Sequence, residues 1–517
     1  MKKFLSLVLM IFTLFVVIGC TSTTTLETTT TLTPTTIDDT TTLNLEFTIN
    51  YYEVQEMILL GNNELSEGEL VVAVVMGGSH TFARTNKDRY FAWGNNNNGQ
   101  LGDGTTEDRL SAVEITDSFS LEVGEKINYF VAGDRHSGAV TNFGRVFTWG
   151  WNFSGRLGDG TSTQRINPTD ITENFSLEVG DKIAYLTMGM QTSAAISSTG
   201  RVYTWGANAS GQLGDGTIFN KNLPTDITAK FNTETDEKVV LISLGYVHSA
   251  SLTNQGRVFT WGNNAYGQLG DGTNSFRINP VDITNNFNFA VDERAMGINL
   301  GENFTILFTN KSNLFTFGLN DKGQLGNGNT DNSSTPININ NQFTLQAEDR
   351  IIKISSGEAH SSFITSNYRV FIWGDNEFGQ LGNGSFVKRI SPYEITNNLM
   401  LKTDELIYSI SLSYGGTSLV TSLGQLKIWG NNDNGQLGNE STNTSSLPID
   451  IVNKDYQSIL LETQDLHVGE SITLYEDERI GYEFSGWYTT DDLSTLFTTT
   501  VMPEEDINLY GQWNNVN

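Results

Sequence analysis

The chain has 517 residues, of which 30 are basic and 59 acidic, for a formal net charge of −29 at pH 7. That excess of negative charge repels phosphate backbones, so the composition argues against nucleic acid as a partner. The single cysteine excludes internal disulfides, and a hydrophobic content of 38% is typical of a folded protein rather than a disordered one.

The N-terminal segment MKKFLSLVLMIFTLFVVIGC has the parts of an export signal. Two lysines precede an apolar run from Phe4 to Ile18, which is shorter than the roughly 20 residues that span a bilayer. The closing letters VIGC resemble the lipobox of bacterial lipoproteins. This resemblance implies that residues 1–20 are a lipoprotein signal and that Cys20 is acylated as the mature N-terminus. The alternative is an ordinary cleaved signal with a free or buried Cys20.

Residues 21–43 are dominated by threonine, which fills 14 of the 23 positions. A stretch with so little apolar surface cannot offset the entropy lost on ordering, so we interpret it as an extended tether. Together with the lipid anchor, the tether would hold the rest of the chain away from a membrane surface. Residues 44–67 form an N-terminal extension, in which the letters MILL (57–60) predict an extra strand.

A motif of the kind WGNNAYGQLGDGT recurs along most of the chain. Its first aromatic residue returns every 56 residues, at Trp93, Trp149, Trp205, Trp261, Phe317, Trp373 and Trp429. Each unit holds about four short β-prone runs separated by glycine-rich turns, without helical periodicity. In the run RVFTW, large or branched side chains occupy both faces, which indicates a sheet that is covered on both sides.

Seven such sheets contain too many residues for one core, whereas radial stacking lets each sheet cover its neighbours. A constant interval implies a constant rotation from unit to unit, and equal rotations close into a ring. The sequence therefore predicts an all-β fold, with a seven-bladed β-propeller over residues 68–452 and a small C-terminal β-rich domain. We expect one blade to borrow a strand from the other terminus, so that segments 70–78 and 447–452 become neighbours.

The stretches GRVFTWGWNFSGRLGDGT and GDRHSGAVTNFGRVFTWG resemble the regulator of chromosome condensation repeat. All seven units carry the resemblance, which implies a seven-bladed propeller. The family is best known for a eukaryotic nucleotide-exchange factor on chromatin, and its bacterial relatives include secreted propellers that cap β-lactamases. Guanine-nucleotide exchange is disfavoured for this chain, because an exported protein meets no cytosolic GTPase.

Two features of the repeat suggest a metal, and a structural role explains both better. Calcium needs six or more oxygens, but GDGT supplies one carboxylate per turn and later units carry asparagine instead. Zinc ligands must converge on one ion, whereas blades spread equivalent histidines around a wide circle. We expect the carboxylates to form turns, the histidines to hydrogen-bond beside a neighbouring blade, and no metal or cofactor. The residues concerned are Asp103, Asp159, Asp215 and Asp271, and His80, His136, His248 and His360.

Partner recognition is expected where the units differ from one another. The copies disagree after GDGT and inside the tryptophan turn, and aromatic residues occur there without an evident core role. Rigid aromatic side chains on loops are common anchors of protein interfaces. The predicted partner-binding residues are Trp151, Phe153, Phe219, Tyr266, Phe276, Phe378 and Phe386. The alternative is that each of them packs under its own turn.

The sequence changes character after the ring. The stretches GYEFSGWYTT and TTVMPEEDINLYGQW resemble the internalin-type B-repeat, or Listeria-Bacteroides repeat, of bacterial surface proteins over residues 457–513. The alternating letters INLYGQW predict a strand, and the aromatic residues are expected in the core of the module. The resemblance implies surface display or adhesion and fixes no ligand.

Together these features predict a non-enzymatic bacterial lipoprotein on the extracellular face of the cell membrane. We expect a monomer that binds a protein or other macromolecule at the propeller rim and meets the membrane only through its lipid. The sequence contains no cysteine nucleophile, GxSxG elbow or phosphate loop.

Two alternatives to this function stay open. One is an inhibitor that caps an enzyme such as a β-lactamase, and the other is an enzyme with its site in the central funnel. Clustered acidic residues with a raised pKa near the channel would favour the enzyme. A contiguous aromatic patch on one rim would favour binding.

Overall fold

A computed structural model describes residues 46–403, 405–467, 482–488 and 507–515. The chain divides into two units, one of residues 54–459 and one that combines residues up to 53 with residues from 460 onward. Cys20 and the threonine-rich tether lie outside the described residues. Within the described ranges, no helix is long and apolar enough to cross a membrane.

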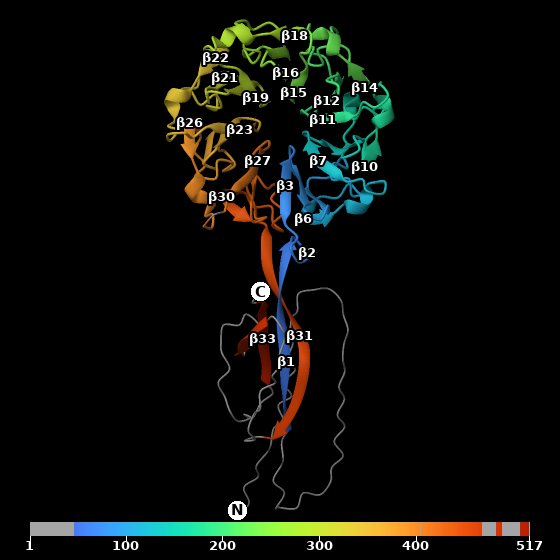
Figure 1. The fold of residues 1–517 in the computed structure, drawn as a ribbon, viewed down its shortest axis with the longest axis vertical. Helices are drawn as coiled ribbons and strands as arrows, with labels where there is room; N and C mark the ends of the chain where they lie inside the picture. The colour runs from blue at the N-terminus through green and yellow to red at the C-terminus, as the bar shows by residue number, and fades with distance from the viewer. Residues whose placement is uncertain (1–45, 404, 468–481, 489–506, 516–517) are drawn as a thin grey trace, which may run out of the picture. The chain divides into compact units, whose positions relative to one another are not determined.

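The larger unit contains seven four-stranded antiparallel sheets arranged as the blades of a ring (Figure 1). Each blade uses four strands that follow one another in the sequence, and the first strand of each lines the centre. The fold is therefore all-β and a seven-bladed propeller, as the repeats predict.

The blades comprise the following strands. Blades 1 to 4 are β3 (Val71–Met76), β4 (His80–Thr85), β5 (Tyr90–Gly94) and β6 (Arg109–Glu114); β7 (Ile127–Ala132), β8 (His136–Thr141), β9 (Val146–Gly150) and β10 (Arg165–Asp170); β11 (Ile183–Met188), β12 (Thr192–Ser197), β13 (Val202–Gly206) and β14 (Lys221–Asp226); and β15 (Val239–Leu244), β16 (His248–Thr253), β17 (Val258–Gly262) and β18 (Arg277–Asp282). Blades 5 to 7 are β19 (Ala295–Leu300), β20 (Phe304–Thr309), β21 (Leu314–Gly318) and β22 (Ser333–Asn338); β23 (Ile351–Ser356), β24 (His360–Thr365), β25 (Val370–Gly374) and β26 (Arg389–Glu394); and β27 (Ile407–Leu412), β28 (Gly416–Thr421), β29 (Leu426–Gly430) and β30 (Ser445–Asp450). Short 3-10 helices lie in the connections at η1 (Thr116–Ser118), η2 (Phe153–Gly155), η3 (Thr172–Asn174), η4 (Thr228–Lys230), η5 (Thr284–Phe287), η6 (Asn340–Gln342) and η7 (Thr396–Leu399).

The repeated tryptophan is a wedge between adjacent blades. Trp149 is fully buried, and its indole N–H donates a 2.9 Å hydrogen bond to the backbone carbonyl of Gln100 in the preceding blade. The Ser137 hydroxyl donates to the same carbonyl at 2.8 Å. Both lone pairs of a buried acceptor are thereby used, and the bonds recur around the ring. The other indole donors are Trp93, Trp205, Trp261, Trp373 and Trp429.

The ring closes through the same indole-to-carbonyl hydrogen bond that joins five other pairs of neighbouring blades. Trp93 of blade 1 donates to the carbonyl of Gln436 in blade 7 at 2.9 Å. The expected exchange of a strand is wrong, because the repeating unit begins with a first strand and ends with a fourth, which leaves each blade complete. The expected proximity of the two segments is confirmed, since Val71 shares a buried cluster with Ile451.

The turn residues have the structural roles expected of them. The Asn96 side chain accepts from the backbone N–H of Leu101 at 2.9 Å and donates to Asp103 at 2.9 Å. The equivalent asparagine makes this pair of bonds in all seven blades. His80 places its Nε2 2.9 Å from the Ser137 hydroxyl of the next blade, and the three other repeated histidines repeat the contact.

Five strands lie outside the blades, at β1 (Glu46–Leu60), β2 (Asn63–Leu65), β31 (Val452–His467), β32 (Tyr482–Tyr488) and β33 (Ile507–Asn515). The letters MILL lie in β1, so the predicted extra strand is confirmed. In the smaller unit, residues 49–53 of β1 pair in parallel with residues 507–511 of β33, which pairs antiparallel with β32. The N-terminal extension thus supplies a strand to the C-terminal sheet. The expected place of the aromatic residues in the core of this module stays a prediction.

Replacing Gly214 with Ala should destabilise the propeller more than the same change at Gly180. Both glycines have positive φ, +72° and +87°, so alanine strains the backbone at each by about 1 kcal/mol. A Cβ at Gly214 would also lie 2.7 Å from the Trp261 indole nitrogen, whereas none meets an atom within 4 Å at Gly180. Chemical unfolding should therefore show a further loss of about 1–3 kcal/mol for Gly214→Ala. Equal losses would contradict the wedge packing.

Candidate binding face and channel mouth

Loops from every blade meet on one face of the propeller. In an antiparallel four-stranded sheet the first and third strands run in the same direction, so the loops that follow them emerge together. We call this side face A; in blade 2 it carries residues 133–135 and 151–164. The loops after the second strands and between the blades form face B.

All seven predicted partner-binding aromatics lie on face A, in the loops between the third and fourth strands of blades 2, 3, 4 and 6. Five have exposed side chains: Phe153 at 63%, Phe219 at 72%, Tyr266 at 42%, Phe276 at 57% and Phe386 at 57%. The alternative of packing under the turn is therefore wrong for these five.

The two remaining aromatics are half-buried, and each is paired. Trp151 stacks on Phe153, with ring centres 5.8 Å apart and planes inclined by 20°. Phe378 lies 6.2 Å from the Tyr414 ring. Among the described residues the predicted aromatics thus form one pair with each other, and Phe378 forms a second with Tyr414, rather than all seven forming one contiguous patch.

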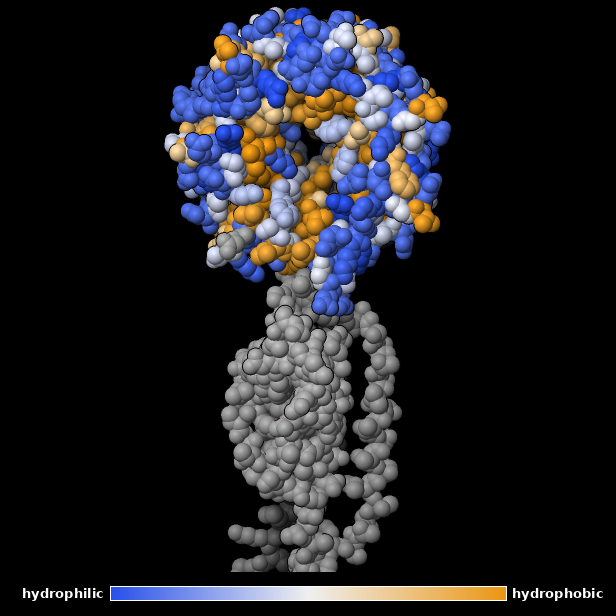
Figure 2. All heavy atoms as spheres, in the orientation of Figure 1, coloured by the Kyte–Doolittle hydropathy of each residue, from blue (hydrophilic) through white to orange (hydrophobic). Residues whose placement is uncertain are grey.

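The centre of face A is hollow. The first strands of all seven blades end around a cavity of about 200 Å³. On the side shown in Figure 2, hydrophobic residues gather around the central opening and hydrophilic residues cover most of the outer rim. One repeat position supplies the most variable wall residues, which are Gly78, Asp134, Met190, Tyr246, Glu302, Glu358 and Tyr414.

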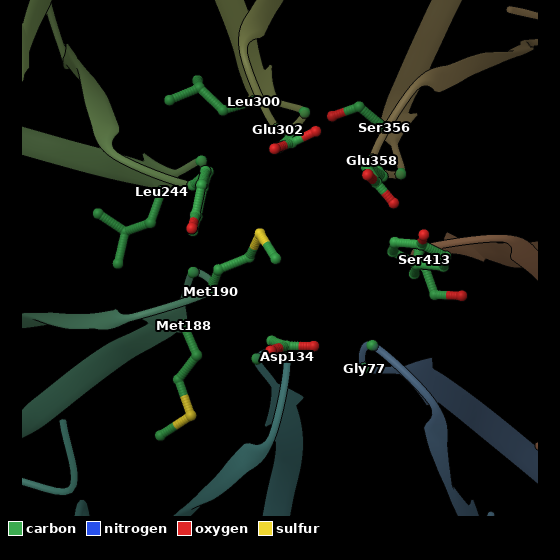
Figure 3. A pocket seen from close by; sticks show the side chains of 18 of the residues that line it. Gly77, Asp134, Met188, Met190, Leu244, Leu300, Glu302, Ser356, Glu358 and Ser413 are labelled. Atoms are coloured by element: carbon green, nitrogen blue, oxygen red, sulfur yellow. The ribbon is translucent and has the colours of Figure 1, made fainter. Parts of the chain in front are cut away.

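Backbone hydrogen bonds between blades hold this mouth together. The N–H of Tyr246 donates to the carbonyl of Glu302 at 3.1 Å, and the N–H of Glu302 donates to that of Glu358 at 3.0 Å. The N–H of Glu358 in turn donates to the carbonyl of Ser413 in blade 7 at 3.2 Å. The ring geometry therefore fixes the two glutamates side by side, facing Asp134 across the cavity (Figure 3).

This crowding changes the acidity of the mouth. Burial, followed by repulsion from Glu302, raises the pKa of Glu358 to about 8. Burial also raises the pKa of Asp134, although Arg135 and Arg156 act in the opposite direction. The charge of Glu358 is the main cause of a raised pKa at Tyr414. Glu358 thus carries a proton near neutral pH.

Sequence reasoning missed the charged members of this site. Asp134, Glu302 and Glu358 share one column of the repeat, and Arg156 stands where the six other units have glutamine. Comparing the seven units column by column would have revealed the arginine. The raised pKa of Glu358 depends on burial and on contact across blades, which no local pattern encodes.

The fold and this face define a seven-bladed β-propeller whose variable loops share one side. The chain belongs to the RCC1-like domain family: the RCC1-like domain profile matches residues 180–479. Profiles of the regulator of chromosome condensation (RCC1) repeat match residues 71–100, 87–140 and 144–196. The Listeria-Bacteroides repeat domain matches residues 453–512, which confirms the second resemblance.

Three relatives illustrate the family. The chain is 30% identical to the ultraviolet-B receptor UVR8 of Arabidopsis thaliana, over 71% of this chain and 78% of UVR8. It is 29% identical to the E3 ubiquitin-protein ligase HERC2 of Homo sapiens, over 73% of this chain but 7% of that protein. The structure of Prp20p from Saccharomyces cerevisiae, described with its binding to Gsp1p and histones, superposes with a TM-score of 0.60 at 22% identity, over 74% of this chain and 88% of that one.

Changing Glu358 to Gln should alter how stability depends on pH. The folded state holds a proton on this carboxyl up to about pH 8, whereas the unfolded chain loses it near the ordinary pKa of 4.5. Wild-type stability therefore declines through this group between these pH values, and a glutamine is spared that decline. Thermal unfolding should show the variant's advantage over the wild type growing from pH 5 to pH 8.

The matched control is Glu377→Gln, which removes one negative charge from the same face at an exposed side chain. The control should show no comparable growth. A Glu358→Gln difference that stays constant across this pH range would contradict the raised pKa.

Proposed function

We propose that this chain is a non-enzymatic, surface-anchored bacterial lipoprotein whose propeller binds a protein partner through face A. The observation that carries the proposal is the set of five exposed aromatic side chains on the loops of one face, at positions where the repeat requires no aromatic residue. Exposed rigid aromatics supply large contact areas at a small entropic cost, which is the usual composition of binding hot spots.

The family supports a role in protein binding. Yeast Prp20, which shares the fold, is described in complex with Kap60 and with binding to Gsp1p and histones. What we transfer is the manner of use, a protein docked on a propeller, and not these partners. An inhibitor that caps an enzyme would use face A in the same way, so it is a special case of this proposal.

The raised pKa of Glu358 is the feature that would favour an enzyme, but the surroundings of this residue explain the shift without a catalytic role. Its raised pKa follows from burial beside Glu302, and the inter-blade backbone bonds impose that proximity. Among the described residues, no group of three or more acidic, histidine or cysteine side chains is arranged to hold a metal ion. A binding role also explains the exposed aromatic side chains, whereas an active site in the mouth does not.

Partner capture tests the role of face A. Residues 44–517, used as bait on surface extracts of bacterial or host cells, should retain a protein that Phe219→Ala or Phe276→Ala releases with an affinity loss of about tenfold each. Phe143→Ala is the control, because Phe143 is 47% exposed and lies in a turn on face B. A partner that tolerates both face A changes, or that responds equally to Phe143→Ala, would place the interface elsewhere.

Fractionation tests the anchor. The export signal, the cysteine after VIG and the threonine-rich tether together support attachment through a lipid on Cys20. Cys20→Ser should move the protein from the membrane fraction to the soluble or secreted fraction, and metabolic labelling with a radioactive fatty acid should disappear. A membrane-bound Cys20→Ser protein would remove the lipid from the proposal while leaving the role of face A intact.

A further inference from the structure

Blade 2 departs from its six copies at four positions that lie close together on face A. Arginine occurs there at residues 135 and 156, and the aromatics Trp151 and Phe153 lie between them in sequence. In no other blade does the equivalent position carry the same kind of residue. The six other blades carry Ser, Gln, Val, Asn, Ala and Gly at the position of Arg135, and Asn, Ala, Asn, Leu, Asp and Asn at that of Trp151. They carry Asn, Ala, Ala, Asp, Glu and Asp at the position of Phe153, and all six carry Gln at that of Arg156.

The position of Arg156 shows what the fold itself requires. In six blades the glutamine side-chain oxygen accepts a 2.9 Å hydrogen bond from the backbone N–H two residues earlier. A guanidinium has no acceptor, so Arg156 cannot make this bond. Ser154, the residue that would donate, adopts a left-handed conformation with φ of 67°, which is unfavourable for a residue other than glycine. Blade 2 therefore loses a structural contact that every other blade keeps.

Arg156 instead buries a charge against the Trp151 ring. It is 1% exposed and donates to the carbonyls of Phe153 at 3.0 Å and Met190 at 2.8 Å. Its guanidinium lies 4.2 Å from the centre of the Trp151 ring. Within the described part of the chain, no carboxylate lies within 4.0 Å of it. Burial lowers its pKa to about 10, so it still carries its charge at neutral pH.

Arg135 adds an exposed charge to the same group of side chains. Its side chain is 54% exposed, and its guanidinium lies 5.3 Å from the Trp151 ring centre. The backbone N–H of Trp151 donates to the Arg135 carbonyl at 2.9 Å, which fixes the two loops together. The counterion is Asp134, 3.3 Å from Arg135, and burial raises the pKa of this carboxyl. Arg135 and Arg156 thus lie near one carboxyl group, that of Asp134, whose raised pKa makes it a weaker counterion.

The opposite side of the mouth has the reverse charge. The tryptophan turns and mouth positions of blades 5 to 7 carry six acidic residues and one lysine, namely Glu302, Glu358, Asp321, Asp375, Glu377, Asp433 and Lys322. Even without Glu358, which holds a proton near neutral pH, the acidic residues outnumber the lysine. In a protein with a net charge of −29, an acidic segment is repelled from that side. Among the tryptophan turns and mouth positions, those of blade 2 therefore carry the excess of positive charge that suits an acidic ligand.

We propose that the blade 2 cluster, defined as Arg135, Trp151, Phe153 and Arg156, receives a carboxylate-bearing segment of the protein partner. Arg135 binds the carboxylate, and the Trp151–Phe153 pair packs against an apolar side chain beside it. Arg156 is a positioning residue that packs its guanidinium against the Trp151 ring and adds its charge to the site. This inference rests on the proposed function and specifies the chemistry of the ligand.

Peptide selection tests the cluster directly, with ligands of defined chemistry. A phage-displayed library of random short peptides, selected on the immobilised full chain, should yield sequences with Asp or Glu next to an aromatic or aliphatic residue. One enriched peptide is then synthesised with its carboxylate and with the matching carboxamide. The wild type should prefer the carboxylate form by about tenfold, as for a hydrogen bond to a charged group. Arg135→Gln, which installs the residue of blade 3, should bind both forms equally.

Arg156→Gln separates positioning from structure. It installs the residue of the six other blades and restores the acceptor for Ser154, so its unfolding temperature should equal or exceed that of the wild type. Its affinity for the carboxylate peptide should nevertheless fall several-fold. Binding and stability thus change in opposite directions, which a purely structural arginine would not produce. A marked loss of stability would overturn the role of Arg156.

Three results would overturn the cluster as the carboxylate site: enriched peptides without acidic residues, equal binding of both peptide forms to the wild type, or an undiminished preference in Arg135→Gln. Peptides that bind through Phe219 or Phe276 and ignore Arg135 would leave the proposed function standing and remove this inference alone. A selection that enriches no peptide would count against both.

Discussion

A single buried carbonyl at each junction between blades sets the geometry of the propeller. It belongs to the residue before the turn leucine, and in blade 1 it accepts from both the indole of Trp149 and the hydroxyl of Ser137. The turn of one blade, the second strand of the next and its third strand must then be in register simultaneously. Blade 5 has Phe317 in place of the indole, and there the Thr305 hydroxyl donates to the Gln268 carbonyl at 2.9 Å. The hydroxyl thus holds the register, while the aromatic ring fills the wedge.

This constraint explains why the fold could be predicted from the sequence. A contact that must be made identically at every junction forces the same letters to recur at a fixed interval, so Trp93 and its copies reveal both the blade and the ring. The smaller unit offered no such signal. Its sheet pairs residues 49–53 with residues 507–511, from opposite ends of the chain. Neither segment has a sequence pattern that identifies the other as its pairing partner. The closure of the ring was mispredicted for a related reason, since nothing in a repeat states where one blade ends and the next begins.

The candidate site was predictable only in part. Aromatic residues such as Phe219 stand out in a loop because the repeat gives them no packing role, and their exposure follows from that. The charged groups of the mouth do not stand out singly. Neither Glu302 nor Glu358 is distinctive in the sequence, and the two become neighbours because a backbone hydrogen bond between blades brings their loops together. The raised pKa of Glu358 is a property of the closed ring rather than of either segment.

The repeated architecture also supplies its own test of which residues serve the fold. Seven blades pack under one set of constraints, so six glutamines that make the same 2.9 Å bond define the structural solution at that position. Arg156 gives up that solution, strains Ser154 and buries a charge, and what it gains in exchange are hydrogen bonds to the carbonyls of Phe153 and Met190 and contact with the Trp151 ring. Seven-fold geometry places blade 2 across the mouth from blades 5 and 6, where the acidic residues gather. A ligand that lay across face A would therefore meet positive charge at one end and negative charge at the other. This polarity would orient the ligand, which the symmetric backbone of seven similar blades could not do alone.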